Sequence, residues 1–315
     1  MSEKTFNELL NEWLLSQKDI LKQGTYYSYH SRITSMIAPI LGDMKISEMT
    51  GDDITDFTVE LQNRGLSPKT VKLAMTVVRN TVLYGAERYG MEKIIPNELE
   101  LPKQKKVEHE PLTAKEQRIL TKFIFSHPVR RNLCILLALT TGVKVGELCG
   151  IQWKDLDFKR NSVYIRQIVY RTSRPKSEKK TTSIVIQECD EKREIPVPSV
   201  LMDEFAKLHN NRPNDFLYSG KEEPVEPRIA STHLKKLLFQ CGVRDVSFND
   251  LRCTFVQNCI DSGGDIMTVA MMLGTYSLNK LLEDFNWKPV EFERAAKLVE
   301  DIGSNITPTS CLAKK

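Results

Sequence analysis

Two basic segments have residue types and spacing that suggest contact with a polyanion. RTSRPKSEKK, residues 171–180, has five basic residues against one acidic residue, and PKQKK, residues 102–106, has three lysines after a proline. Grouped ammonium and guanidinium ions bind phosphates, whereas a single such segment is more often solvated surface charge. The candidate phosphate ligands are Lys103, Lys105, Lys106, Arg171, Arg174, Lys176, Lys179 and Lys180.

Arg252 is a further candidate, because it stands at the start of an otherwise apolar helical pattern in NDLRCTF. A guanidinium in such a position needs an anionic partner, and a protein carboxylate and a bound phosphate fit the sequence equally well. Ser247 and Asp250 match the S-x-x-D capping box, which begins a helix by satisfying its free N–H groups. The segment therefore predicts a helix with or without a functional arginine.

Cysteines and apolar runs argue against other kinds of site. The seven cysteines are scattered without a C-x-x-C pair, which favours buried free thiols in a reducing compartment over disulfides or a zinc site. The first residues lack the pattern of a signal peptide, and no run of about 18 apolar residues is present. We therefore expect a cytoplasmic protein with no membrane partner. The net charge of +4 is compatible with a polyanionic partner but too small to establish one.

The elements that must position these residues begin with a helical region. Four segments carry apolar residues at helical spacing and open on Ser or Thr, which can cap a helix: 5–14, 25–41, 50–65 and 67–90. One apolar stripe predicts core packing by Phe6, Leu9, Leu10, Trp13 and Leu14. Gly65 is expected to end one helix, and Ser67 and Pro68 to begin the next. We predict a helical domain over residues 1–102.

The pattern changes after a basic linker at 103–111. Helical patterns continue over 112–127, 130–151, 200–210, 230–242 and 289–303. Three short β-branched runs separated by polar turns interrupt them, at 161–170, 182–188 and 193–198. The sequence thus predicts a mostly α protein with a small antiparallel β-sheet, in which an α+β domain over 112–303 precedes a flexible tail over 304–315. A chain of 315 residues is long enough for two such cores.

Ordered motifs along the chain resemble the tyrosine recombinase (phage integrase) family. LTTGVKVGELCGIQWKDLDF is similar to its TG-x-R-x-GEL signature followed by L-x-W-x-D-x-D, and REIPVP to the strand after its active-site lysine hairpin. NDLRCTF resembles its H-x-L-R-H-T-F helix, and LGTYSLNKLLEDFNW its L-G-H segment that ends in the nucleophilic tyrosine. The resemblance covers about residues 5–302, and it implies a SAM-like core-binding domain followed by a catalytic-type domain.

The resemblance also implies a reaction. In the family a tyrosine oxygen attacks a DNA phosphate and stays attached to it, two arginines bind the non-bridging oxygens, and lysine and histidine transfer protons. Double-stranded DNA is thus the implied partner, with no metal and no cofactor. Carried over position by position, the family's catalytic groups correspond to Lys144, Gln187, Asn249, Arg252, Thr275 and Phe285.

Only Arg252 keeps the family residue. Lys144 retains the charge of the first arginine but lacks the planar fork that gives a phosphate two parallel N–H bonds. Gln187 cannot act as a cationic acid, although Lys180 and Lys192 lie near it in the sequence. Asn249 and Thr275 replace histidines, and Phe285 has no nucleophilic atom and also completes an apolar stripe at helical spacing.

We therefore predict an integrase homologue that binds DNA, has lost strand cleavage and acts as a regulatory, architectural or accessory factor of a bacterial nucleoid. One alternative is an active, or deliberately disabled, site-specific integrase of a mobile element. A second alternative is a protein-interaction module without DNA binding. The expected protein partner is an active recombinase or a second copy of the chain, bound through the C-terminal helix that PVEFERAAKLVEDIG predicts.

Overall fold

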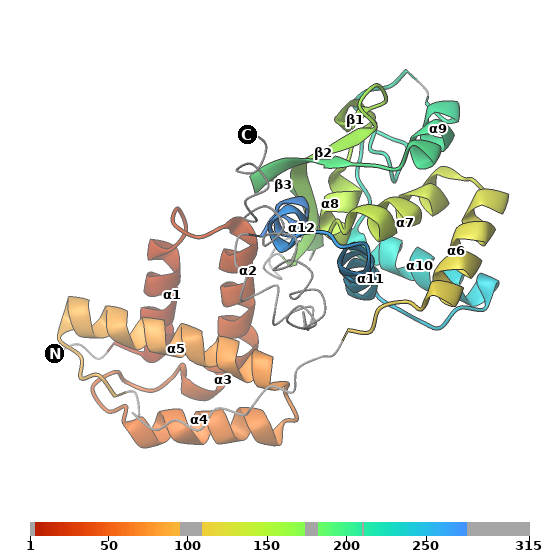
Figure 1. Cartoon of the computed structure of the whole chain (residues 1–315). Coiled ribbons are helices and arrows are strands. Elements are labelled where there is room, and N and C mark those ends of the chain that lie inside the picture. Colours follow the sequence, from red (N-terminus) through yellow and green to blue (C-terminus); the bar gives the residue numbers. More distant parts are fainter. Residues whose placement is uncertain (1–3, 95–108, 174–181, 210, 276–315) are drawn as a thin grey trace, which may run out of the picture.

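The computed structural model describes residues 4–94, 109–173, 182–209 and 211–275. These residues form a helical N-terminal body and an α+β C-terminal body, each with its own hydrophobic core (Figure 1). The N-terminal body consists of α1 Phe6–Ser16, α2 Gln23–Arg32, α3 Ala38–Leu41, α4 Gly51–Asn63 and α5 Pro68–Tyr89. The chain is therefore mostly helical in its first part, as predicted.

Local sequence signals explain most of the N-terminal body. The predicted apolar stripe of α1 is fully buried. Gly65 follows α4 with a φ of 69°, and the Ser67 side chain accepts the N–H of Thr70 at the start of α5. The prediction for the second helix was wrong in detail. It begins at Gln23 because the Lys22 carbonyl accepts the Thr25 N–H, so Thr25 does not cap it, and a π-helical turn at Ile33–Ile37 separates it from α3.

The C-terminal body contains a three-stranded antiparallel sheet in the order β1-β2-β3. Its strands are β1 Leu156–Asp157, β2 Ser162–Ser173 and β3 Thr182–Pro196. Its helices are α6 Ala114–Ser126, α7 Arg130–Thr141, α8 Val145–Gly150, α9 Ser199–Lys207, α10 Pro227–Cys241, α11 Phe248–Asp261 and α12 Ile266–Leu273, and a 3-10 turn lies at Trp153–Asp155. The predicted mostly α class with a small antiparallel sheet is confirmed.

Two elements differ from the sequence prediction. Gly142 adopts a φ of 65° and ends α7, so the helical pattern over 130–151 becomes two helices. The runs 182–188 and 193–198 were expected to be separate strands, but 182–188 and 193–196 belong to the single strand β3, which ends at Pro196. Its register passes from Arg193 opposite Ile165 to Glu188 opposite Gln167, so the polar residues between them form a bulge rather than a turn.

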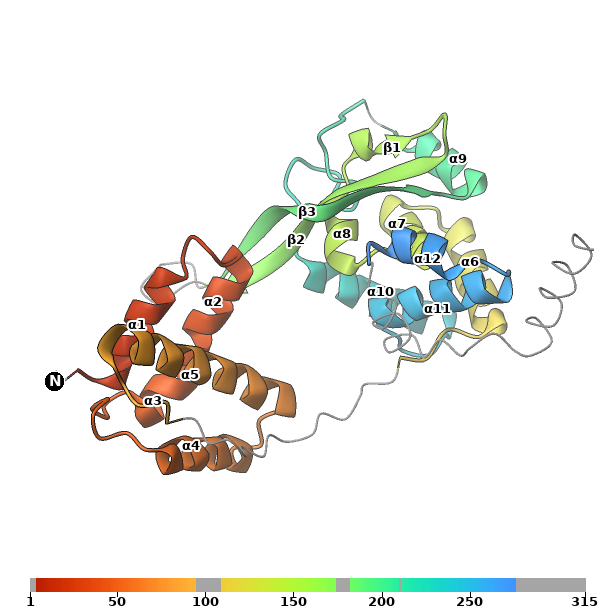
Figure 2. The ribbon, with the colours of Figure 1, turned by 60° about the vertical axis from the view of Figure 1, so that its left-hand side comes forward.

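The two bodies meet where α2 lies against the β2–β3 hairpin (Figure 2). This contact places the beginning of α2 next to the bulge of β3 and to α8. Within the described ranges, no helix is long and apolar enough to span a membrane. The six described cysteines are free thiols, of which three are buried and three are partly exposed.

Candidate functional site

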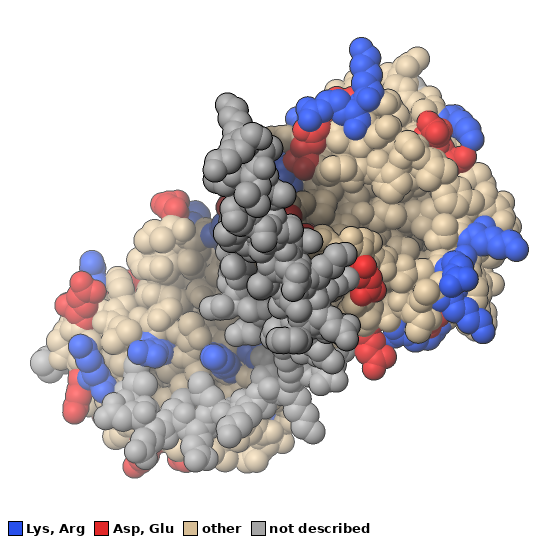
Figure 3. Space-filling view, in the orientation of Figure 1, with Lys and Arg blue, Asp and Glu red and all other residues tan. Residues whose placement is uncertain are grey.

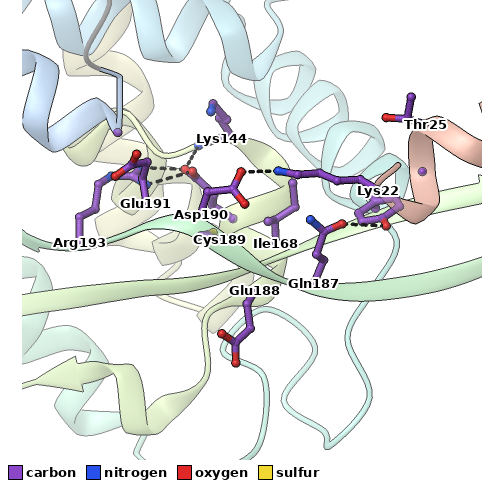
Figure 4. Close-up of a pocket in the computed structure, with 14 residues that line it drawn as sticks. Lys22, Thr25, Lys144, Ile168, Gln187, Glu188, Cys189, Asp190, Glu191 and Arg193 are labelled. Carbon is purple, nitrogen blue, oxygen red and sulfur yellow. Dashed lines mark hydrogen bonds and ion pairs between the residues drawn. The ribbon is translucent and has the colours of Figure 1, made fainter. Parts of the chain in front are cut away.

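The cavity at the junction of the two bodies brings together α2, α8 and the β2–β3 hairpin (Figure 4). It is open to solvent and has a volume of about 400 Å³. Lys144 and Gln187, two of the predicted site residues, both line it. Its other lining residues are Lys22, Gly24, Thr25, Glu147, Ile168, Tyr170, Glu188, Cys189, Asp190, Glu191, Arg193 and Gly274.

Lys144 is positioned by the turn between α7 and α8. The left-handed conformation of Gly142 reverses the chain, and Lys144 then occupies the N-terminal cap of α8. Its main-chain N–H donates to Oε2 of Glu147 at 2.8 Å, which leaves the exposed side chain at the cavity. The cavity therefore has an ammonium ion at this position, which lacks the two parallel N–H groups that a guanidinium would offer to a phosphate.

Glu147 and Arg193 form a buried, bidentate ion pair beneath the cavity. Nη1 of Arg193 donates to Oε1 of Glu147 at 3.1 Å, and Nη2 donates to Oε2 at 2.9 Å. Nε of Arg193 donates to the Met272 carbonyl at 2.7 Å, so all three sides of the guanidinium are engaged. Burial alone would raise the pKa of Glu147, but the bonds from Arg193 and the Lys144 amide hold this pKa below its ordinary value. The pair therefore fixes the cavity wall.

Gln187 binds a tyrosine of the neighbouring strand. The hydroxyl of Tyr170 donates to Oε1 of Gln187 at 3.0 Å, and both side chains are partly buried. A neutral amide in this position cannot donate a proton to a leaving alkoxide as an ammonium ion can.

The charged groups around the cavity do not favour an added phosphate. Four carboxylates line it, from Glu147, Glu188, Asp190 and Glu191, against three cations, from Lys22, Lys144 and Arg193. Arg193 is committed to Glu147, and Lys22 pairs with Asp190. Figure 4 shows Glu188 pointing away from the other labelled carboxylates, and it pairs with Lys192 at 2.6 Å. With Lys192 counted, four carboxylates face four cations, so the charges around the cavity balance and two of the three lining cations are already paired.

Arg252 is buried, with 8% of its surface exposed, and does not line the cavity. Its guanidinium donates to two main-chain carbonyls, those of Gly142 and, at 2.9 Å, Leu273. Each carbonyl lies within two residues of a cavity-lining residue, Lys144 or Gly274. Both of these partners are neutral, and the anionic partner that the sequence suggested stays a prediction. The guanidinium joins the turn before α8 to the end of α12.

Asn249 and Thr275 also lie outside the lining of the cavity. Asn249 is exposed in the first turn of α11, and the main-chain N–H of Thr275 donates to the Ala270 carbonyl at 3.1 Å. The predicted capping box at the start of α11 is confirmed, because Ser247 and Asp250 exchange side-chain and main-chain hydrogen bonds.

Several predicted residues cannot be placed. Phe285, the helical pattern at 289–303 and seven of the eight candidate phosphate ligands in segments 102–106 and 171–180 lie outside the described residues. The exception is Arg171, whose Nη1 lies 3.2 Å from Oε1 of Glu226. Within the described ranges, no group of three or more histidine, cysteine or acidic residues could hold a metal ion.

Sequence reasoning missed a second set of basic residues. Lys69, Lys72 and Arg79 are exposed on α5 at helical spacing, and none of them takes part in an ion pair among the described residues. Figure 3 shows Lys and Arg side chains spaced along the region that α5 occupies in Figure 1. The signal in the sequence was their spacing of three and seven residues, which places them on one face of a helix. Glu147 and Arg193 were not predicted as site residues either, although both lie inside segments that resemble the family's motifs.

Family models match both parts of the chain. The phage integrase family model covers residues 110–281, more than half of the chain, and the phage integrase N-terminal SAM-like domain model covers residues 5–62. The chain belongs to the phage integrase family. It is also homologous to tyrosine recombinases of bacteria and archaea.

Curated relatives of this integrase-family chain include two bacterial proteins that match over 301 residues. The tyrosine recombinase XerC-like protein of Caldanaerobacter subterraneus subsp. tengcongensis is 24% identical, over 86% of this chain and 76% of the relative. The ICEBs1 integrase of Bacillus subtilis is 24% identical, over 89% of this chain and 78% of the relative.

Solved structures share the integrase-family fold. The Tn1549 transposon integrase in complex with circular intermediate DNA has a TM-score of 0.73 and 17% identity, and the match covers 95% of this chain and 99% of that chain. A lambda integrase tetramer bound to a Holliday junction has a TM-score of 0.66 and 18% identity, over 92% and 81% of the two chains. The two-body architecture is therefore that of known integrases.

Proposed function

We propose that this chain binds duplex DNA between its two bodies but does not cleave it. The observation that carries the proposal is the composition of the cavity at the family's catalytic positions. Lys144 and Gln187 replace an arginine and a lysine there, and carboxylates pair with two of the three cations that line the cavity, Lys22 and Arg193. A site that stabilises a phosphoryl transition state needs the opposite arrangement, with guanidinium and ammonium groups directed at the growing negative charge.

DNA binding is supported by family membership and by exposed basic residues. The integrases solved as DNA complexes share the two-body fold over almost the whole chain. The α5 stripe, formed by Lys69, Lys72 and Arg79, supplies three cations on one helix face. The segments 102–106 and 171–180 contain the eight basic residues that the sequence predicts as phosphate ligands. Seven of these eight lie outside the described ranges. We propose that residues 103–111 link domains at 1–102 and 112–303.

The loss of cleavage is supported by independent substitutions. Phe285 lacks the hydroxyl that would attack phosphorus, and Asn249 and Thr275 cannot replace histidines as acids near neutral pH. Tyr170 is the phenol at the cavity among the described residues, but its hydroxyl is hydrogen-bonded to Gln187. For this chain to be an active integrase, other groups would have to replace the missing catalytic groups at several of these positions at once.

A test of DNA binding is fluorescence anisotropy with a labelled duplex over a series of salt concentrations. If the basic residues bind phosphates, log affinity falls linearly with log salt, with a slope of about −0.9 for each phosphate contact. Affinity independent of salt, or no binding at low salt, would favour the protein-interaction alternative. A variant in which Lys69, Lys72 and Arg79 are all changed to glutamine should give a shallower slope of log affinity against log salt than the unaltered chain.

We also propose a regulatory, architectural or accessory role on DNA, in which the chain associates with an active recombinase or with a second copy of itself. The segment 289–302 carries an apolar stripe at helical spacing that would dock on the partner. Deleting residues 289–315 should abolish DNA-dependent oligomers in sedimentation velocity while the remaining chain stays folded. Unfolding of the truncated chain would instead show that this segment belongs to its own core.

A further inference from the structure

Strand β3 is an edge strand of the sheet. The order β1-β2-β3 leaves one side of β3 without a paired strand among the described residues. From Thr182 to Glu188 the strand pairs with β2 in an unbroken register, and the bulge begins only after Glu188. The outer main-chain N–H and C=O groups of this stretch therefore need hydrogen-bond partners from outside the sheet.

This edge lacks the features that usually prevent the addition of a further strand. Proteins protect exposed edges with charged side chains, prolines or bulges. Residues 182–187, TSIVIQ, contain no charged residue and no proline, and four of the six are β-branched. β-branched residues favour strand pairing, so the composition of this edge favours pairing with another chain.

Two isoleucines on one face of β3 are exposed along this edge. Ile184 is 44% exposed and Ile186 is 47% exposed, whereas Val169, opposite Ile186 on β2, is fully buried. Helix α8 packs closely on β2 (Figure 2), since a Cβ atom added to Gly146 would lie 2.7 Å from the Val169 carbonyl oxygen. The sheet is thus covered at β2, and an apolar surface remains open along β3.

The same edge of a second copy of the chain is complementary to this one. A two-fold axis perpendicular to the sheet sets two β3 strands antiparallel and keeps the isoleucines of both copies on one face. With the axis at Val185, Ile184 faces Ile186 of the second copy, and the reverse pair forms on the other side of the axis. The two copies of Glu188 then lie three residues to either side of the axis, about 20 Å apart, so their repulsion is largely screened.

We propose that residues 182–188 of β3 pair antiparallel with the same residues of a second copy, so that three strands from each chain form one continuous sheet. A second copy is the occupant because it already holds its own strand extended, so pairing costs little conformational freedom. The contact is separate from the segment 289–302, which is proposed above as a docking segment, and it requires no DNA.

Sedimentation velocity over a series of protein concentrations, without DNA, tests the pairing. The unaltered chain should dimerise reversibly as its concentration rises. Changing Ile184 and Ile186 together to lysine, or together to glutamate, should weaken dimerisation by about 100-fold, because like charges then face each other and the apolar contacts are lost. An equimolar mixture of the two variants should form a heterodimer, because opposite charges then face each other across the axis.

A matched control changes two exposed apolar residues away from the edge. Val129, at the start of α7, and Val200, on α9, are 58% and 54% exposed. Val129→Lys with Val200→Lys should leave the dissociation constant of the dimer within a few fold of the unaltered value. All four positions are exposed, so thermal melts should show every variant folded. Equal weakening by the control would refute a specific role for β3.

Hydrogen–deuterium exchange locates the contact without any substitution. Main-chain amides of residues 182–188 should exchange more slowly at concentrations where the chain is dimeric than at concentrations where it is monomeric. A chain that stays monomeric at every concentration, or a dimer without this protection, would overturn the proposal. A mixture of the two charged variants that associates no better than either variant alone would contradict the antiparallel register.

Discussion

Replacing Arg252 with methionine removes the guanidinium and keeps a side chain of similar length. Arg252 is 8% exposed and donates to the carbonyls of Gly142 and Leu273, which are 110 and 21 residues away in the sequence. Methionine can fill much of the space but cannot donate a hydrogen bond. The substitution therefore leaves both carbonyls without this donor.

The expected loss follows from those two bonds. A buried polar group that loses its partner costs about 1–3 kcal/mol, so two carbonyls give about 2–6 kcal/mol in the free energy of unfolding. For a unit of this size each 1 kcal/mol lowers Tm by roughly 2–4 °C. Arg252→Lys should lose most of the same stability, because one ammonium cannot reproduce the fork that joins the two carbonyls.

Urea unfolding and thermal melts measure the stability, and anisotropy under native conditions measures DNA affinity. Arg79→Met makes the same chemical change at an exposed position and should alter the free energy of unfolding by less than about 0.5 kcal/mol. If Arg252 acts mainly through the two carbonyls, folded Arg252→Met keeps its DNA affinity within a few fold. An unchanged Tm with a large, uniform loss of affinity would refute this account and would place Arg252 on a DNA phosphate.

Two other predictions concern the cavity wall and the α5 stripe. Glu147→Gln should lower the free energy of unfolding by about 3–5 kcal/mol, because it leaves the buried Arg193 without its carboxylate. Since the pKa of Glu147 lies below its ordinary value of 4.5 in the folded chain, the pair stabilises fully above that value and its contribution is lost as pH falls through the folded pKa. Urea midpoints of the two proteins should therefore converge in acid, and a constant difference from pH 7 to pH 3 would contradict the assignment. Changing Lys69, Lys72 and Arg79 to glutamine should reduce the salt slope of DNA affinity by roughly 0.9 for each phosphate that is no longer neutralised, while an unchanged slope would exclude the stripe from the interface.

Local signals were sufficient for the parts of the fold that depend on neighbouring residues. The apolar stripe of α1, the glycine that ends α4 and the capping box of Ser247 and Asp250 all act within a few residues, and all three are present. The resemblance to the family implied that Lys144 and Gln187 belong to one site; both line the cavity, and their part in a catalytic site stays a prediction.

Contacts between distant residues could not be predicted in this way. The bulge in β3 depends on its register with β2, which no local pattern specifies. Lys22 and Asp190 are 168 residues apart, and their pairing depends on how the two bodies meet. Two partners of Arg252 are main-chain carbonyls, which every residue carries, so residue types gave no indication of them.

The most direct test of the central claim is a nicked suicide duplex that traps a covalent protein–DNA adduct. The duplex is built on a sequence protected by the chain in footprinting, and the products are separated on native and on denaturing gels. We predict a complex on the native gel and no adduct that survives denaturation, both for the unaltered chain and for Phe285→Tyr, because Lys144, Gln187, Asn249 and Thr275 remain substituted. A denaturation-resistant adduct with the unaltered chain would contradict the account.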